Sequence, residues 1–239
     1  TSTTRSTGYS CWQLDDSSGL MAIKIYDCFL FNNELDILEL KLAEQYDEVD
    51  YFVIGEANRT FKGDPKPFYL LDNWERFAPY HNKIRRIEIT TTADSDPWVN
   101  ETQDREELVR GLYDADGDDV IICSDTDEIL RQSALITMRK LTAVNRFDLR
   151  MPQFYYRLNY MMKQWKTTDD VYVCWLCTGQ AIRFRLLNGI EKQRKERLTL
   201  TRDGTIIVWH AGWHFSFQGD NTFVDQKMKT FDYTWLGDV

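Results

Sequence analysis

The chain has 239 residues, of which 43% are hydrophobic and 14% aromatic, and its formal charge at pH 7 is −9. This length and composition suit one globular domain with a single core. The acidic balance would repel a polyanion, so nucleic acid is excluded as an expected partner. No stretch approaches the ~20 consecutive apolar residues that a membrane-spanning helix needs, so we expect no such segment in this chain.

The start of the chain and its cysteines bear on where the protein works. Residues 1–19 are rich in Ser and Thr, which predicts a linker or the remnant of a stem below an upstream anchor; residues 20–239 are expected to form the domain. Five cysteines are too sparse for a dense disulfide framework, although one bridge is compatible with them. Cys174 and Cys177 lie in a strand-like run and are expected to pack in the core rather than to bind a metal.

Strand and helix patterns alternate strictly through the first half of the chain. Apolar runs rich in β-branched residues predict strands, and apolar positions that recur every three or four residues predict helices. Asn32 or Asn33 is expected to cap the first helix. In chain order the predicted elements are a strand at Leu20–Tyr26, a helix at Glu34–Tyr46, strands at Val49–Gly55 and Lys83–Ile89, a helix at Asp96–Tyr113 and a strand at Val120–Cys123.

The second half of the chain loses this strict alternation. The run Val120–Cys123 is apolar throughout, which is typical of a central parallel strand covered on both faces. We therefore predict an α/β fold with a mixed central sheet flanked by helices. The elements predicted after this strand are a helix at Arg131–Leu141, strands at Arg146–Tyr156, Val171–Cys177 and Thr205–Trp209, and a closing amphipathic segment at Thr222–Phe231.

An acidic turn, Ser124 to Glu128 with the sequence SDTDE, directly follows the strand predicted to be central. In open α/β sheets, ligands bind beyond the carboxyl ends of the strands. Three carboxylates on one turn repel one another unless a cation offsets them, and Mg²⁺ and Mn²⁺ prefer carboxylate oxygens and often share a substrate's phosphates. The other interpretation is a cap for the following helix, because Ser, Asp and Thr are good N-caps. The spacing alone favours neither interpretation.

Several common enzyme classes lack their motifs in this sequence. Neither GxxxxGK[ST] nor GxGxxG occurs, which disfavours a kinase or a dehydrogenase. His210 and His214 are spaced as in zinc proteases, but the Glu base between them is absent and Gly212 lies where a helix would run. There is no GxSxG motif, and a total of three histidines leaves few options for a Ser-His triad.

Four strings, taken in order, resemble glycosyltransferase family 17: IYDCFLFNNELDILELKL, VDYFVIGEANRTFKGDPKP, DDVIICSDTDEI and HAGWHFS. The resemblance covers the chain from about Ala22 to about Asp232 with matched spacing. It implies a GT-A fold, a UDP-sugar donor such as UDP-N-acetylglucosamine (UDP-GlcNAc), inversion at the anomeric carbon, and a Mn²⁺ or Mg²⁺ ion. It also implies a glycan or glycoprotein acceptor, with the β-linked mannose of an N-glycan core as a candidate. The expected location is the Golgi lumen, as a type II membrane protein whose anchor lies outside this chain; a soluble or secreted protein is the alternative.

The resemblance assigns roles to particular residues. The acidic metal motif of the family falls on Asp125 and Asp127, and a late histidine ligand falls on His214, although a histidine beside Trp and Phe is otherwise typical of a packed position. No role is carried onto His210. Among the donor candidates, Lys66, Arg105 and Arg183 are the candidate partners of the diphosphate, with surface salt bridging as their alternative role. The candidate donor-binding residues are Asp27, Glu56, Asn58, Arg59, Lys66, Arg105, Asp125 and Arg183.

The base and the acceptor site are less well defined by the sequence. The candidate bases are Glu128, Asp220 and Asp225, each of which is otherwise an ordinary acid. Two other functions fit the same motifs: an inactive module that binds a sugar or UDP, and a sugar-nucleotide hydrolase or nucleotidyltransferase that uses the same diphosphate site. The aromatic residues that are candidates for an acceptor platform, with core packing as the alternative, are Tyr155, Tyr156, Trp165 and Trp213.

Overall fold

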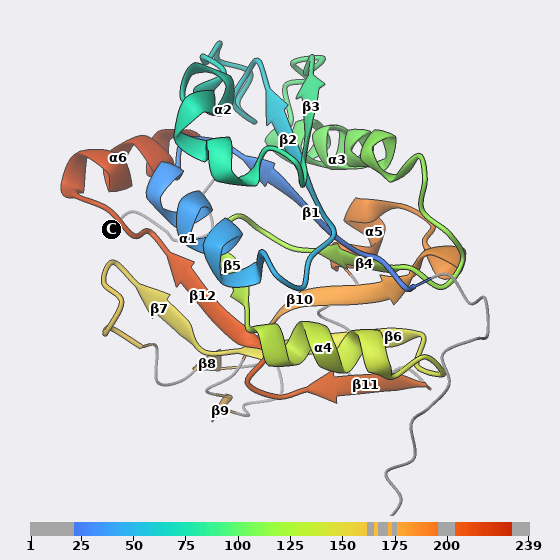
Figure 1. The fold of residues 1–239 in the computed structure, drawn as a ribbon. Helices are drawn as coiled ribbons and strands as arrows, with labels where there is room; N and C mark the ends of the chain where they lie inside the picture. The colour runs from blue at the N-terminus through green and yellow to red at the C-terminus, as the bar shows by residue number, and fades with distance from the viewer. Residues whose placement is uncertain (1–21, 162–164, 167–171, 174–175, 196–203, 231–239) are drawn as a thin grey trace, which may run out of the picture.

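The structure of the protein is a computed structural model that describes residues 22–161, 165–166, 172–173, 176–195 and 204–230. A seven-stranded sheet forms its centre (Figure 1). In the order in which they lie side by side, its strands are β11 (Thr205–Val208), β6 (Arg146–Met151), β10 (Leu176–Arg183), β4 (Val120–Cys123), β1 (Ile25–Phe31), β2 (Tyr51–Ala57) and β3 (Ile84–Ile89). Strand β10 runs antiparallel to β4 and β6, whereas the other pairs are parallel. The predicted mixed α/β sheet is confirmed.

Helices cover both faces of the central sheet. One face carries α1 (Leu35–Gln45), α2 (Tyr69–Asp72), the 3₁₀ helix η1 (Trp74–Tyr80) and α4 (Gln132–Lys140). The other face carries the 3₁₀ helix η2 (Glu107–Leu112) and α5 (Ile190–Lys195), with α3 (Pro97–Glu106) beside them. The 3₁₀ helix η3 (Phe184–Leu186) leads from β10 towards α5, and α6 (Asn221–Thr230) is the last described helix. Within the described residues, no helix has the length and apolar character needed to cross a bilayer.

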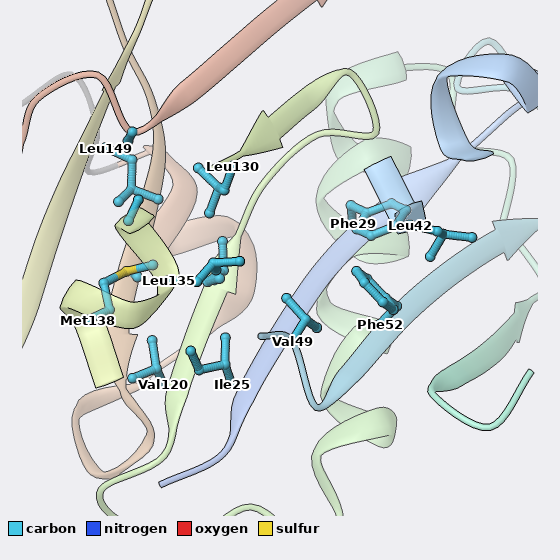
Figure 2. Packing of buried hydrophobic residues seen from close by; sticks show 14 of the residues in the cluster. Ile25, Phe29, Leu42, Val49, Phe52, Val120, Leu130, Leu135, Met138 and Leu149 are labelled. Atoms are coloured by element: carbon cyan, nitrogen blue, oxygen red, sulfur yellow. The ribbon is translucent and has the colours of Figure 1, made fainter. Parts of the chain in front are cut away.

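The two faces hold separate apolar clusters because side chains alternate along each strand. Figure 2 shows the first cluster, which includes Phe29 of the sheet with Leu42 of α1 beside it, and Leu135 of α4. Tyr26 and Cys28 point the other way and pack in the second cluster. The same alternation turns the residue between them, Asp27, towards α1.

A second, three-stranded sheet covers the carboxyl end of β4. Its strand order is β5 (Glu128–Leu130), β12 (Gly212–Ser216) and β7 (Gln153–Tyr155). Strand β12 is antiparallel to β5 and parallel to β7. The short strands β8 (Trp165–Lys166) and β9 (Tyr172–Val173) form a separate antiparallel pair. The second sheet brings the segment around His214 next to the segment that follows β4 (Figure 1).

Most predicted elements of the first half exist, with three corrections. The first strand begins at Ile25 rather than Leu20, which lies outside the described residues, and it continues through the charged Asp27. The predicted cap by Asn32 or Asn33 is wrong, since Glu34 is in the N-cap position of α1 without a side-chain cap hydrogen bond. The helix predicted from Asp96 is confirmed, and Asp96 caps it, but its last part winds more tightly as η2.

The second half departs further from the predicted elements. The strand predicted at Arg146–Tyr156 is divided into β6 and β7, and Pro152, which has no N–H to give to a ladder, lies at the break. Strands β5 and β12 were not predicted. The strand at Thr205 is confirmed, and the segment predicted to be amphipathic at the end of the chain forms the helix α6. The packing predicted for Cys174 and Cys177, and the linker predicted for residues 1–19, lie outside what the structure describes, so both stay predictions.

Candidate active site

The acidic turn lies at the carboxyl end of β4, between β1 and β10. Its last residue, Glu128, begins strand β5, and helix α4 starts only at Gln132. The N-cap position of α4 is held by Arg131 without a side-chain cap. The interpretation of the turn as a helix cap is therefore wrong, because the turn enters a strand. Instead, a backbone hydrogen bond closes the acidic turn: the Glu128 N–H donates to the Asp125 carbonyl at 3.1 Å.

A buried lysine of α1 binds the acidic turn from the core side. Lys41 Nζ lies 2.9 Å from Ser124 Oγ, 3.1 Å from the Asp125 carbonyl and 2.8 Å from the Glu128 carbonyl. Its ion-pair partner is Asp27, at 3.1 Å. Asp27 is fully buried and also accepts hydrogen bonds from Ser124 Oγ at 2.6 Å and Gln45 Nε2 at 2.7 Å. These contacts hold the Asp27 side chain in the core, so we no longer assign Asp27 to binding of the sugar-nucleotide donor.

Asp127 is contacted from two later segments of the chain. Its Oδ1 lies 3.4 Å from His214 Nε2 of β12, and its Oδ2 accepts a hydrogen bond from Lys227 Nζ of α6 at 3.2 Å. Lys227 also forms an ion pair with Glu34 at 3.1 Å. Burial by itself raises the pKa of Asp127, but Lys227 and His214 outweigh it and hold the pKa well below its usual range. Asp127 is therefore a carboxylate at neutral pH.

His214 is fixed by the second sheet. It lies opposite Glu128 in the β5–β12 ladder, and its backbone N–H donates to the Pro152 carbonyl at 3.0 Å. Its Nε2 lies 3.0 Å from Ser216 Oγ, and its Nδ1 lies 4.0 Å from Glu128 Oε1. Burial lowers the pKa of His214, but Asp127 and Glu128 outweigh burial, so the pKa is raised from its ordinary value. A metal cation bound to the His214 ring in place of the proton would face the same two carboxylates, those of Asp127 and Glu128.

The pair Asp127 and His214 fits two ligands of one hard divalent ion. Neighbouring ligands in an octahedron with bonds of ~2.1 Å lie ~3 Å apart, and the carboxylate oxygen and the ring nitrogen are separated by 3.4 Å. Within the described ranges, however, no group of three or more His, Cys, Asp or Glu side chains has an arrangement that could hold a metal. A metal bound here would take these two ligands from the described side chains, and a substrate's phosphates and water would have to complete its coordination.

Asp125, the other acid of the predicted metal motif, faces two arginines. Its Oδ1 accepts from Arg105 Nη2 at 2.5 Å, and its Oδ2 accepts from Arg194 Nη2 at 2.9 Å. Both guanidiniums also lie within ion-pair distance of Glu101 and Glu191. The charge of Asp125 is thus offset by α3 and α5. Arg105, a predicted diphosphate partner, does lie at the turn, and Arg194 joins it there.

The residues at the end of β2 and just after it, which are predicted to contact the sugar-nucleotide donor, form hydrogen bonds and an ion pair within the protein. Glu56 is fully buried, pairs with Arg86 at 2.9 Å and accepts from the Leu70 N–H at 2.6 Å. Asn58 Oδ1 accepts from the Thr91 N–H at 3.2 Å, and Arg59 donates to the Gly63 carbonyl at 2.9 Å. These bonds shape the loop after β2. Direct contact of Asn58 and Arg59 with a donor stays a prediction, whereas Glu56 is closed off by its partners.

The two other cations predicted to bind the diphosphate have contrasting positions. Lys66 Nζ is buried without a hydrogen-bond partner in the described part of the chain. Burial lowers its pKa, against the attraction of Glu56 and Glu34. Arg183 is at the opposite end of the sheet, paired in register with Val120, and donates to the carbonyls of Asp118 at 2.7 Å and Leu141 at 2.8 Å. Arg183 is therefore withdrawn from the donor site, and Lys66 is retained.

Three of the predicted acceptor aromatics lie on or next to the second sheet. Tyr155 and Tyr156 stack around Phe217, with ring centroids 6.1 and 5.9 Å from it. Tyr156 is 54% exposed, and both Tyr156 and Phe217 have a left-handed backbone, with φ of 62° and 55°. Such conformations cluster at functional sites. Trp213 packs under the Arg131 guanidinium, whose carbon is 4.2 Å from the ring centroid. Trp165 is in β8, and its side chain lies outside the described part.

The three candidate bases differ in their surroundings. Glu128 is fully buried, and its Oε2 accepts from the Asp125 N–H at 3.0 Å. Asp220 is exposed at the start of α6, where its Oδ1 accepts from the Phe223 N–H at 2.8 Å. Asp225 is exposed on the same helix. Of these three described carboxylates, only that of Glu128 accepts a hydrogen bond within the acidic turn, and this bond helps to hold the turn together.

Sequence reasoning missed three cations that surround the acidic turn. They are Lys41, Arg194 and Lys227. For Lys41 a signal was present, because it lies between Leu38 and Leu42 on the apolar face of a predicted helix, where a charged side chain needs a buried partner. For Lys227 the signal was weaker, because it lies in an amphipathic segment near the end of the chain where charged residues are expected. Arg194 had no comparable signal in the sequence.

The fold is a mixed α/β sheet flanked by helices, with an acidic turn at the carboxyl end of its central strand. The chain belongs to glycosyltransferase family 17, whose model matches residues 3–234. The expected resemblance is thereby confirmed.

Two curated relatives illustrate the similarity. The chain is 26% identical over 229 residues to the beta-1,4-mannosyl-glycoprotein 4-beta-N-acetylglucosaminyltransferases of Rattus norvegicus and of Homo sapiens. Each match covers 82% of this chain, but only 41% of the rat protein and 42% of the human protein. The chain thus spans about two fifths of the length of these relatives.

Solved structures resemble the fold only distantly. A mannosyltransferase, PcManGT from Pyrobaculum calidifontis in complex with GDP-Man and Mn²⁺, has a TM-score of 0.46 and 12% identity, covering 84% of this chain and 58% of that chain. The 2-C-methyl-D-erythritol 4-phosphate cytidylyltransferase of Francisella tularensis has a TM-score of 0.39 and 11% identity, covering 87% of this chain and 100% of its own. With these low scores, the ligands of neither structure are carried over to this chain.

Proposed function

We propose that this chain is an inverting, metal-dependent glycosyltransferase that transfers N-acetylglucosamine from UDP-GlcNAc to a glycan, with the β-linked mannose of an N-glycan core as the candidate acceptor. Membership in family 17 supports sugar transfer, and the names of the relatives support this sugar and acceptor. The single observation that carries the proposal is the approach of His214 to Asp127, to 3.4 Å, at the carboxyl end of the central strand. An acceptor of this kind belongs to the secretory pathway, with the Golgi lumen as the proposed location.

In the proposed site, Asp127 and His214 would hold the divalent ion, Mn²⁺ or Mg²⁺. When bound, such an ion stabilises the negative charge that develops on a departing diphosphate. The chain's own cations would add to this: Arg105 and Arg194 both hydrogen-bond to Asp125 at the turn, and Lys66 is a further proposed contact of the diphosphate. Guanidiniums suit a diphosphate because their N–H groups can bind two oxygens at once. Asp125 would then hold both guanidiniums in position rather than bind the ion directly.

Inversion requires a base that accepts the proton of the acceptor hydroxyl. Asp225 and Asp220 are exposed on or next to α6, whereas Glu128 is buried against His214. An exposed acid is accessible to an acceptor, and a fully buried acid is not. We therefore rank Asp225 and Asp220 ahead of Glu128 as candidate bases. Tyr155 and Tyr156 are the proposed acceptor platform, and Trp213 and Trp165 remain further candidates.

The direct test is an assay of UDP release from UDP-GlcNAc with Mn²⁺, with and without an N-glycan acceptor. We expect release to require both the metal and the acceptor, and mass spectrometry to show one added N-acetylglucosamine. Release without acceptor would indicate a hydrolase, and binding of UDP without release would indicate an inactive binding module. Either outcome would overturn the proposal.

A matched pair of variants tests the proposed role of Asp127. Asp127→Asn removes the charge that holds a metal while keeping the shape of the side chain, and we expect transfer to fall at least about 100-fold, on the order of the loss of an essential charge-stabilising group. Asp36→Asn makes the same change on an exposed carboxylate of α1 and should leave transfer unchanged. Circular dichroism of both variants should match the unmodified chain. Metal-dependent turnover retained in Asp127→Asn would refute the assignment.

A further inference from the structure

Lys41 is a charged side chain enclosed in the core. It is fully buried on α1, on the helix face that also carries Leu38 and Leu42. Its ammonium lies within 3.1 Å of four oxygen atoms: the carbonyls of Asp125 and Glu128, the Ser124 hydroxyl and the Asp27 carboxylate. Each N–H of the ammonium can therefore be satisfied without water.

Stability alone does not account for this arrangement. Removing a lysine and an aspartate from water has a large desolvation cost, and apolar residues of similar volume often serve a core as well or better. The partner Asp27 comes from β1, and Gln45, which donates to Asp27, also accepts from the Leu130 N–H at 2.8 Å. The ion pair therefore links β1, α1 and both ends of the acidic turn. Such buried polar networks fix one conformation when every member is satisfied.

The contacts of Lys41 lie at the two ends of the segment that carries Asp127, the residue proposed to bind the metal. The carbonyls of Asp125 and Glu128 lie on either side of Thr126 and Asp127, so the ammonium holds both ends of this two-residue segment. Between them, Thr126 Oγ1 donates to the Leu30 carbonyl at 2.7 Å, and the Asp127 carbonyl accepts from the Phe215 N–H at 2.8 Å. The backbone of Asp127 is thus held from the core side and from β12.

We propose that Lys41, together with Asp27, is a positioning residue that fixes the acidic turn so that the Asp127 carboxylate faces His214. This inference deepens the proposed function, because it rests on Asp127 being a metal ligand. Lys41 itself touches neither the metal nor the substrate. Residues that orient metal ligands in this way typically account for 10- to 100-fold in metal affinity.

The test uses variants that separate positioning from folding. Lys41→Met alone leaves Asp27 as an uncompensated charge in the core and is expected to fold poorly. Lys41→Met with Asp27→Asn removes both charges and keeps the volume of both side chains, so this double variant should fold. We expect it to bind Mn²⁺ at least about tenfold more weakly than the unmodified chain, measured by calorimetry with Mn²⁺ alone. Exchange of the Phe215 amide, which donates to Asp127, should be faster.

Lys83→Met is the matched control. Lys83 Nζ also binds two carbonyl oxygens of one turn, those of Tyr46 at 2.6 Å and Val49 at 2.8 Å, but this turn follows the carboxyl end of α1. Its loss should lower the melting temperature without changing Mn²⁺ affinity or Phe215 exchange. A double variant with the Mn²⁺ affinity and Phe215 exchange of the unmodified chain would overturn the positioning role. If the unmodified chain binds no Mn²⁺, the metal part of the proposed function fails, and Phe215 exchange still decides the role of Lys41.

Discussion

Lys227 Nζ lies 3.2 Å from Asp127 Oδ2, on the side of the carboxylate away from the oxygen that faces His214. The same ammonium lies 3.1 Å from Glu34 Oε1, so one cation of α6 offsets two acids from distant parts of the chain. The positive charge that the acidic turn requires is therefore supplied in part by the protein itself. This has a direct consequence for metal binding.

Removing the Lys227 charge should strengthen the binding of Mn²⁺. Two cations that share one carboxylate repel each other, by about 4 kcal/mol at 4 Å for an effective dielectric constant of about 20. After relaxation, we expect Lys227→Met to bind Mn²⁺ about tenfold more tightly in calorimetry, and Mn²⁺ to raise its melting temperature more than that of the unmodified chain. Lys229→Met removes the same charge from an exposed position of α6 and serves as the control. Equal Mn²⁺ affinities in the two variants would contradict this expectation.

His214 should matter for metal affinity in a pH-dependent way. A proton on Nε2 competes with a metal, and the raised pKa of His214 means that this competition persists to higher pH than for an ordinary histidine. In the unmodified chain, Mn²⁺ affinity should therefore rise as pH increases through neutrality. We expect His214→Gln to bind Mn²⁺ at least about tenfold more weakly, with a flatter pH dependence.

The control for this histidine is His210→Asn. His210 is exposed and has a left-handed backbone with φ of 55°, which asparagine tolerates. Its substitution should alter neither the affinity nor the pH dependence. An equal effect of the two substitutions would show that His214 does not contact the ion.

The sequence predicted the position of the site better than its contacts. The apolar run Val120–Cys123 identified the central strand, and the end of a central strand identified the acidic turn. Local patterns were sufficient here because a buried strand and its exit turn are adjacent in the chain. Pairing between segments far apart was not predicted, so the β5–β12 ladder that brings His214 to Glu128 was missed. The placing of His214 near Asp127 came from the family resemblance alone.

Charged residues were the least predictable part of the site. Arg183 and Arg105 were grouped as diphosphate partners, yet the structure brings only Arg105 to the turn. A cation reveals its charge in the sequence but not which oxygens surround it. Asp27 was misjudged for the same reason, since its partner Lys41 comes from a different element. Buried ion pairs depend on tertiary packing, which the spacing of residues in one segment does not encode.

Asp104 should make folding stability depend on pH. Its buried carboxyl accepts hydrogen bonds from Thr91 Oγ1 at 3.0 and 3.1 Å, but burial dominates and raises its pKa to about 6. The unfolded pKa is about 3.9, so the folded state binds the proton more tightly, and this contribution to stability is lost as pH rises from about 4 to about 6. Asp104→Asn, which still accepts from Thr91, should be about 2 kcal/mol more stable than the unmodified chain at pH 7.5.

The measurement is urea unfolding of both proteins between pH 4 and pH 8. The difference in free energy of unfolding should become small at the acid end, where Asp104 is protonated in the folded state and about half protonated in the unfolded state. A difference that is constant over this range would indicate that Asp104 does not titrate with a raised pKa.

Tyr156 should affect acceptor binding without affecting the donor. Its ring is 54% exposed beside Tyr155 and Phe217, so one face is available to a sugar. Tyr156→Asn removes the ring but suits the left-handed backbone, for which φ is 62°. Loss of one aromatic contact of about 0.5–1.5 kcal/mol corresponds to a rise in acceptor KM of about two- to twelvefold. The KM for UDP-GlcNAc should stay the same.

Tyr113→Asn provides the comparison for this prediction. Tyr113 is 77% exposed and lies against the Arg85 guanidinium, away from the acidic turn, so its loss removes an exposed tyrosine ring from a different surface. Its acceptor KM should equal that of the unmodified chain. If Tyr156→Asn instead raised the donor KM, or changed neither value, the acceptor would have to bind elsewhere, and Trp213 on β12 would become the next residue to test.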